Sequence, residues 1–370
     1  MKVGLLTLPL LYNYGAILQA YALHKVINDM GCECVLIDKE LPVYPYYRRP
    51  LSIINRLLQR FILGKKCQIF PYWMPKRVER HISKNTRKFV DDNIQPKTKL
   101  VKHLSKKHDI YDAYIVGSDQ VWRRSIPLKI ENYLFDFVSE EKKKIAYAAS
   151  FGVDYWEFNK SKTKLFKKLL SRFSAVTVRE DSAISLIHQN LDLKSSQVLD
   201  PTLLLTKQDY LSLLRKNNKF EGIFTYILDN STYKQNLIHE IQQRLNLPVF
   251  DLKPKSKNYY IKNTDFYVYP EVEKWLELMA YSKFIVTDSF HGTVFSIIFN
   301  KPFIVVPNES RGNTRIESII KLCNLQSRFY KKENNIHDII NTPIDWDKVN
   351  DIVSDERQRC ISLLKEMIFK

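Results

Sequence analysis

FIVTDSFHGTVFSIIFNKPFIVV, residues 284–306, predicts a β-strand that passes directly into a helix. Residues 284–287 are apolar or β-branched and predict a buried strand, and residues 293–299 predict the helix that follows. A single histidine, His291, lies between the two elements. Parallel strands of open α/β sheets bind ligands at their carboxyl ends, and the first N–H groups of a helix favour an anion. We therefore expect a ligand site at this junction.

His291 has two interpretations from the sequence. Histidine side chains titrate near neutral pH, so one beside an anion site suits general acid or base chemistry on a phosphorylated or carboxylated substrate. The alternative is a histidine that caps the helix or packs in the core. Asp288, Ser289 and Gly292 flank it in the sequence.

Strand and helix signals alternate along the rest of the chain, which predicts an α/β protein. In the first part, strands are expected at 2–8, 34–38, 113–116, 145–149, 175–178 and 197–199, with a helix at 15–29. In the second part, strands are expected at 223–228, 249–252, 284–287 and 303–306, with helices at 232–245, 271–281, 293–299 and 315–322. Four polar or small residues stand just past strand ends, where a site would assemble: Gly117, Ser150, Arg179 and Asp200.

These elements predict two Rossmann-like domains facing a cleft, at 1–205 and 206–345, and a long amphipathic helix within 346–370 that can cross back to the first domain. Neither half contains GxGxxG or GxxxxGK[ST], which argues against a dinucleotide cofactor and a P-loop. No apolar run reaches the roughly 18 to 20 residues that span a bilayer. Five scattered cysteines without a CxxC pair favour reduced thiols in a cytoplasmic protein, and no HExxH or DxD pattern predicts a metal.

The net charge of +18 is concentrated in residues 42–110, which contain 17 Lys or Arg against 4 Asp or Glu, a balance of +13. This insertion includes six apolar residues at helical spacing on one face: Leu51, Ile54, Leu57, Leu58, Phe61 and Ile62. One hypothesis is that it rests on an anionic inner leaflet or binds a pyrophosphate-linked lipid. The alternative is an ordinary helix packed on its own domain. No nucleic-acid-binding motif accompanies the charge, so nucleic acid is not an expected partner.

Five motifs in order resemble the polysaccharide pyruvyl transferase family: NYGAILQAYAL at 13–23, VGSDQVW at 116–122, VREDSA at 178–183, VLDPTLLL at 198–205 and DSFHGTVFSIIFNKPFIVV at 288–306. The resemblance implies a fold similar to that of GT-B glycosyltransferases. It also implies that phosphoenolpyruvate donates its three-carbon unit to two sugar hydroxyls, which gives a cyclic ketal and phosphate. Phosphoenolpyruvate is then a substrate, and no cofactor or metal is expected.

The resemblance implies that the donor binds mainly to the second domain. It also implies that Arg179, at the end of a strand of the first domain, contacts the donor. His291 matches the family's histidine and would act as the acid or base, and Arg179 would clamp the donor's anionic groups. The alternative for Arg179 is a surface pair with Glu180 or Asp181. The donor-binding set also includes Ser289, Phe290, Gly292 and Thr293.

The chain departs from the family pattern directly before the histidine. Many members have arginine and leucine there, whereas this chain has Ser289 and Phe290. Arg315 or Arg311, in the following loop and helix start, would replace the missing arginine.

The first domain would hold the sugar acceptor, which can be lipid-pyrophosphate-linked. The expected acceptor residues follow two strand ends: Asn13, Tyr14, Gly15, Gln19, Ser118, Asp119, Gln120 and Trp122. Gly15 would permit close approach of a ligand, and Trp122 would stack on a sugar ring. For Asp119 the alternative is a helix cap. Two other functions stay open: a GT-B glycosyltransferase that uses a nucleotide sugar, and a non-catalytic protein of envelope-polysaccharide assembly.

Overall fold

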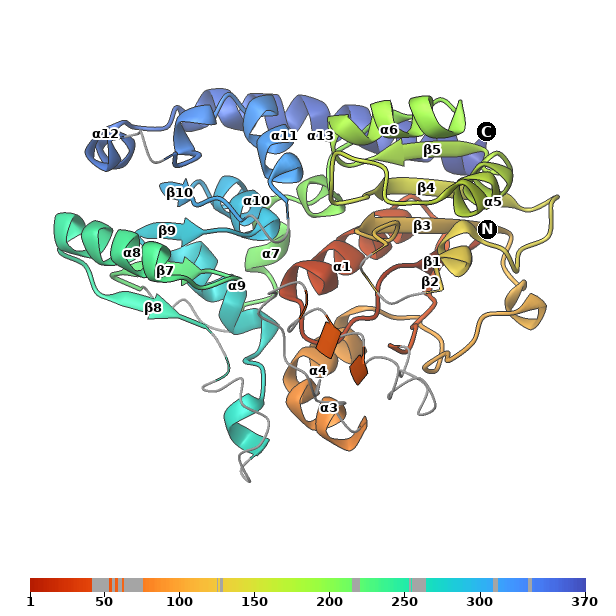
Figure 1. Cartoon of the computed structure of the whole chain (residues 1–370), viewed down its shortest axis with the longest axis horizontal. Coiled ribbons are helices and arrows are strands. Elements are labelled where there is room, and N and C mark those ends of the chain that lie inside the picture. The colour runs from red at the N-terminus through yellow and green to blue at the C-terminus, as the bar shows by residue number, and fades with distance from the viewer. Residues whose placement is uncertain are drawn as a thin grey trace.

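The computed structural model describes residues 1–41, 53–54, 57–58, 62, 76–124, 126, 129–214, 220–252, 254, 264–308, 312–331 and 335–370. These residues form two parallel sheets that lie side by side with helices packed around them (Figure 1). This arrangement confirms the predicted α/β class with two parallel-sheet units. Arg311 lies outside the described residues.

The first sheet has the strand order β2-β1-β3-β4-β5-β6, and all of its neighbouring strands are parallel. Its strands are β1 Lys2–Leu6, β2 Glu33–Leu36, β3 Ala113–Asp119, β4 Lys143–Ala149, β5 Ala175–Val178 and β6 Ser196–Gln197. The helices of this part are α1 Tyr14–Asp29, α3 Lys76–Ile82, α4 Lys84–Asn93, α5 Lys160–Leu170 and α6 Asp181–Leu191. All six strands were expected, because apolar runs of this length between turn residues are typical of buried parallel strands.

The second sheet has the order β10-β9-β7-β8 and is also parallel. Its strands are β7 Ile223–Tyr226, β8 Val249–Asp251, β9 Phe284–Thr287 and β10 Phe303–Val305. The later helices are α7 Lys207–Leu211, α8 Thr232–Leu245, α9 Val272–Tyr281, α10 Phe290–Ile298, α11 Thr314–Leu322, α12 Ile336–Asn341 and α13 Trp346–Phe369. Helix α10 begins three residues before the expected start.

One hydrophobic cluster joins the two sheets. It includes buried side chains of α1 from the first part of the chain and of α9 and α10 from the second. The ring of Tyr14 stacks on Trp275 with centroids 5.8 Å apart, and its hydroxyl donates to the carbonyl of Pro270 at 3.0 Å. Because burying such aromatic rings contributes strongly to packing, this shared core holds the start of α1 against α9.

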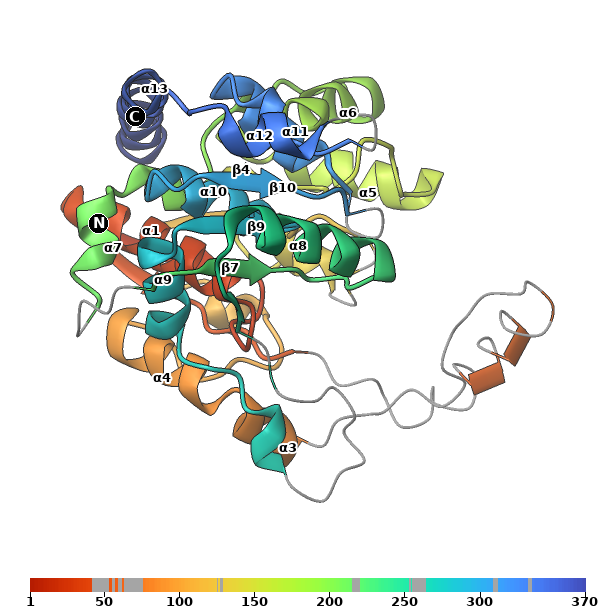
Figure 2. The same cartoon turned by 90° about the vertical axis from the view of Figure 1, so that its left-hand side faces the viewer.

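The last helix, α13, lies against the first sheet although it follows the second sheet in the sequence. It runs across the top of both sheets in Figure 1 and is seen end-on in Figure 2. Lys143 Nζ donates to the carbonyl of Ile368 at 3.0 Å, and Arg359 Nη2 donates to the carbonyl of Gln197 at 3.1 Å. These contacts tie the end of the chain to strands β4 and β6.

The basic insertion is only partly described, and Leu51 and Phe61 of its expected apolar face lie outside the described residues. Three other residues of that face are exposed: Ile54 by 52%, Leu58 by 48% and Ile62 by 71%. Among the described residues, no helix has the length and apolar character needed to cross a membrane.

Candidate active site

His291 is the second residue of α10 and is buried at the carboxyl end of β9. Ser289 caps this helix, because its side chain accepts a hydrogen bond from the backbone N–H of Gly292 at 3.4 Å. The interpretation of His291 as a cap is therefore wrong. Its Nε2 lies 3.7 Å from Oδ2 of Asp200 and has no hydrogen-bond partner among the described residues. A buried imidazole nitrogen without a partner is available to a ligand.

Gly15, in the first turn of α1, lies directly against the imidazole of His291. A Cβ atom at this position would be 2.0 Å from Nδ1 of His291 and 2.2 Å from its Cγ. No side chain fits in that space, so only glycine permits the contact. The expectation that Gly15 admits a ligand is corrected: the group that approaches its backbone is the histidine of the other sheet.

Asp200 follows β6 and is fully enclosed beside His291. Its Oδ2 accepts from Arg179 Nη1 at 2.8 Å and from Ser118 Oγ at 3.1 Å, and its Oδ1 accepts from Thr202 Oγ1 at 2.7 Å. Burial alone raises the pKa of Asp200, but the contacts with His291, Arg179 and Thr202 lower it well below the usual range of an aspartate. The site therefore contains a carboxylate that is ionised at neutral pH next to the histidine.

Arg179 is buried between two carboxylates and an aromatic ring. Besides its bond to Asp200, its Nη2 donates to Oδ1 of Asp119 at 3.3 Å, and its guanidinium lies over the ring of Phe290 at 4.3 Å from the centroid. Burial lowers the pKa of Arg179, but Asp200 and Asp119 raise it overall. The alternative surface pair is wrong, because Glu180 instead accepts from Ser150 Oγ at 2.9 Å.

Asp119 is the last residue of β3 and does not cap a helix. Its backbone has a φ of +68°, in the left-handed region that non-glycine residues seldom adopt. Burial raises the pKa of Asp119, whereas Arg179, His291 and Arg315 lower it overall. The carboxylate is thus placed between the cations of the two sheets, and its unusual backbone marks a position where strain often accompanies function.

Arg315, in the first turn of α11, supplies a second guanidinium near Phe290, 6.0 Å from the ring centroid. With the Gln120 amide oxygen turned toward it, that oxygen accepts from Nη1 at 2.9 Å and Nη2 at 3.1 Å. Burial and the neighbouring Arg179 lower the pKa of Arg315 to about 10. Arg315 stays protonated at neutral pH, and because burial and Arg179 both disfavour its charge, a bound anion would stabilise it.

Gly292 and Thr293 are not brought into this cluster. A Cβ on Gly292 would lie 2.1 Å from Oγ1 of Thr287, so this glycine serves tight packing of α10 on β9. The hydroxyl of Thr293 donates to the carbonyl of Ser289 at 3.1 Å and is fully buried. In this structure both residues serve packing, and their contact with the donor stays a prediction.

Three expected acceptor residues are occupied by packing. Trp122 is fully buried, stacks in an aromatic cluster and donates through Nε1 to the carbonyl of Tyr133 at 3.2 Å. Gln19 is buried and accepts from the backbone N–H of Ser118 at 2.8 Å, which ties α1 to β3. Tyr14 packs on the second sheet, as described above. These side chains are buried in this structure, so none of them offers a face to a sugar here.

Asn13 and Gln120 are the expected acceptor residues that remain accessible. Asn13 is exposed and also caps α1, since its Oδ1 accepts from the backbone N–H of Ala16 at 3.3 Å. Gln120 is half-buried beside Arg315. Both lie at the carboxyl edge of the first sheet.

A small cavity of about 40 Å³ adjoins Arg179, Asp200 and Phe290, with α11 and α13 on its other side. Ligand pockets usually occupy about 300 Å³ or more, so this cavity is small for a substrate, and His291 is not among its lining residues. Among the described residues, no group of three or more His, Cys, Asp or Glu side chains is placed to hold a metal ion.

Comparisons with known proteins identify a family. The family model described as polysaccharide pyruvyl transferase matches residues 13–310. No curated protein matches the chain in sequence.

Solved structures similar to this chain include a UDP-GlcNAc 2-epimerase from Neisseria meningitidis bound to UDP-GlcNAc, with 11% identity, coverage of 100% of this chain and 99% of that chain, and a TM-score of 0.48. MurG from Acinetobacter baumannii has 10% identity, coverage of 99% of both chains and a TM-score of 0.40. We infer no activity from likenesses at this level.

Proposed function

The chain belongs to the polysaccharide pyruvyl transferase family, and on this premise we propose that it moves the pyruvate unit of phosphoenolpyruvate onto two hydroxyls of a sugar. One hydroxyl proton ends on the methylene carbon of the donor, which becomes a methyl group. The other leaves with the phosphate. Both sugar oxygens then bond to the same carbon, which gives the cyclic ketal. The observation that carries the proposal is the buried His291 beside two arginines.

The two arginines suit the charges of phosphoenolpyruvate. The guanidinium groups of Arg179 and Arg315 lie 4.3 and 6.0 Å from the centroid of the Phe290 ring. Arg179 follows β5 of the first sheet, and Arg315 lies in α11, in the part of the chain that forms the second sheet. A donor with a carboxylate and a phosphate relieves the repulsion between two guanidinium groups, and guanidinium binds both anions bidentately. Arg315 thus takes the place of the arginine that the family pattern expects at Ser289.

His291 is the proposed acid or base. Its Nε2 is buried, lacks a hydrogen-bond partner among the described residues, and lies 3.7 Å from the Asp200 carboxylate. At this distance the carboxylate can hold the ring in position while Nε2 accepts a proton from a sugar hydroxyl. Asp200 is accordingly a positioning residue for His291.

The acceptor is proposed to lie at the carboxyl edge of the first sheet, near Asn13 and Gln120. Their amide groups can bind sugar hydroxyls as donors and acceptors. Because the cavity beside Arg179 is small, we propose that the two sheets separate slightly to admit donor and acceptor.

Ligand-dependent stabilisation tests the donor. Phosphoenolpyruvate at about a hundredfold excess over its Kd is expected to stabilise the folded protein by about 2.7 kcal/mol, which raises the melting temperature. Inorganic phosphate at the same concentration is the control for a simple anion effect. A nucleotide sugar that raises the melting temperature when phosphoenolpyruvate does not would contradict the proposal and favour a glycosyltransferase.

We also propose that the protein is cytoplasmic and that its basic insertion contacts the anionic inner leaflet of the membrane. The exposed Ile54, Leu58 and Ile62 are spaced four residues apart on a basic segment, as in interfacial helices. Changing all three to serine is expected to reduce flotation with anionic liposomes more than tenfold, since each buried apolar side chain contributes about 1.5–3 kcal/mol. The control is Tyr155→Ser with Phe369→Ser, two exposed side chains elsewhere. Equal flotation of both variants and the original protein contradicts this part.

A further inference from the structure

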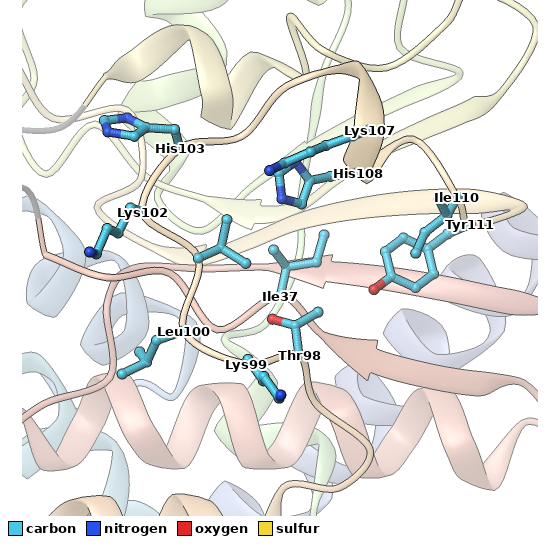
Figure 3. Close-up of a pocket in the computed structure, with 11 residues that line it drawn as sticks. Ile37, Thr98, Lys99, Leu100, Lys102, His103, Lys107, His108, Ile110 and Tyr111 are labelled. Atoms are coloured by element: carbon cyan, nitrogen blue, oxygen red, sulfur yellow. The ribbon is translucent and has the colours of Figure 1, made fainter.

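A second cavity, of about 420 Å³, lies at the edge of the first sheet. It borders Ile37, just past the edge strand β2, and the segment 98–111 that runs beside that strand. Figure 3 shows the side chains that surround it. None of them belongs to the cluster around His291. Its volume falls in the range of about 300–1,000 Å³ that is typical of small-molecule sites.

No acidic side chain is among the residues that line this cavity, whereas five of its lining residues are lysines or histidines. They are Lys99, Lys102, His103, Lys107 and His108. Across the described part of the chain, none of the three lysines forms an ion pair, whereas the nearby Lys97 pairs with Asp91 at 3.2 Å. Unpaired ammonium groups around one cavity create a positive potential that attracts anions.

His108 adds an imidazole ring to this set. The backbone N–H of Ser105 lies 3.1 Å from its Nδ1, and the carbonyl oxygen of Ser105 lies 3.2 Å from the same atom, so Ser105 engages Nδ1 and leaves Nε2 for a ligand. Figure 3 shows Lys107 and His108 side by side above Ile37. An oxygen-rich anion thus meets ammonium and imidazole donors together.

The floor and margin of the cavity are apolar. Ile37 and Tyr111 are buried, and the ring of Tyr111 packs against Gly4, where a Cβ would lie 2.5 Å from its Cδ2. At the margin, Leu100 is 48% exposed and Ile110 is 66% exposed. A purely inorganic anion leaves these apolar surfaces uncovered, but an anion attached to an organic group covers them.

We propose that this cavity is a second binding site and that it takes an organic diphosphate. The lysines bind the phosphate oxygens, and the organic group covers the exposed Leu100 and Ile110. A prenyl diphosphate and a nucleoside diphosphate share this chemistry. The site shares no residue with the candidate active site.

Calorimetric titration of the full chain with geranyl diphosphate, UDP and inorganic pyrophosphate tests the proposal. At least one organic diphosphate is expected to bind about tenfold more tightly than inorganic pyrophosphate, a difference of about 1.4 kcal/mol. Tighter binding of geranyl diphosphate identifies a lipid as the source, and tighter binding of UDP identifies a nucleotide. Equal binding of all three overturns the proposal.

A matched pair of triple variants locates the binding. The first variant combines Lys99→Ala, Lys102→Ala and Lys107→Ala. It is expected to bind the organic diphosphate about tenfold more weakly than the original protein. Lys160→Ala, Lys164→Ala and Lys168→Ala remove the same charge from the exposed face of α5 and are expected to leave affinity unchanged. Equal weakening in both variants indicates a general charge effect and overturns the site. Stabilisation by phosphoenolpyruvate should persist in both, which separates failure here from failure of the proposed function.

Discussion

Replacing His291 with glutamine is expected to lower kcat for ketal formation by about 10²- to 10⁴-fold, the usual contribution of a general acid or base. Glutamine keeps a polar side chain of similar length, so the fold and the binding of phosphoenolpyruvate should persist. Phosphate release under saturating donor and acceptor measures kcat, and thermal stabilisation by phosphoenolpyruvate measures binding. Retention of full activity by this variant would show that the imidazole takes no part in the reaction.

A substitution at Gly15, in the first turn of α1, is expected to displace the imidazole of His291. Gly15→Ala places a Cβ at 2.0 Å from Nδ1 of His291, so the ring must move and kcat must fall. Overpacking of this kind also costs about 1–3 kcal/mol of stability. Ala22→Gly, further along α1, is the control, because it loses about 1 kcal/mol of helix stability without touching the histidine. A similar kcat for both variants would mean that lost stability, not displacement of the ring, explains the effect.

Arg179→Gln is expected to reduce the free energy of unfolding by about 3–5 kcal/mol, because it leaves two buried carboxylates without their shared cation. Those carboxylates belong to Asp119 and Asp200, which Arg179 meets at 3.3 and 2.8 Å. Denaturant unfolding measures the change. The KM for phosphoenolpyruvate should rise as well, since the site loses one of two guanidinium groups near the proposed donor.

A double-mutant cycle shows whether the loss is electrostatic. Adding Asp200→Asn to Arg179→Gln removes one uncompensated charge. The loss in the free energy of unfolding of the double variant is therefore expected to be about 0.5–3 kcal/mol smaller than the sum of the two single losses. Arg244→Gln is the matched control, because Arg244 pairs with Glu240 at 2.9 Å on an exposed face of α8. This substitution should lower the free energy of unfolding by about 1 kcal/mol or less. Additive losses in the cycle would contradict the ion-pair account of Arg179.

Local pattern predicted the elements that carry the site. The apolar run at 284–287 gave β9, and α8, β5 and α13 have the expected bounds, because apolar periodicity reports burial directly. The strand-end rule also grouped Arg179 and Asp200 correctly, since parallel strands deliver their carboxyl ends to one edge. Helix α10 begins earlier than expected because Ser289 provides a cap that the apolar pattern does not register.

Contacts between distant segments could not be predicted from spacing. Nothing in the local sequence shows that Gly15 lies against His291, or that Asp200 and Asp119 share Arg179. These contacts depend on how the two sheets pack. Trp122 was misplaced for the same reason: its position after a strand suggested an exposed ring, but an indole can bury 150–250 Å², and here it packs against Phe151 and Phe166.

The most direct test of pyruvyl transfer is incubation with phosphoenolpyruvate and a panel of galactose-, glucose- and N-acetylmannosamine-bearing acceptors. Phosphate release and the mass of the acceptor are measured together. We predict that one acceptor releases phosphate and gains the mass of one pyruvate ketal in equal molar amounts, and that His291→Gln abolishes both signals. Transfer of a sugar from a nucleotide sugar to these acceptors, with phosphoenolpyruvate left unconsumed, would contradict the account.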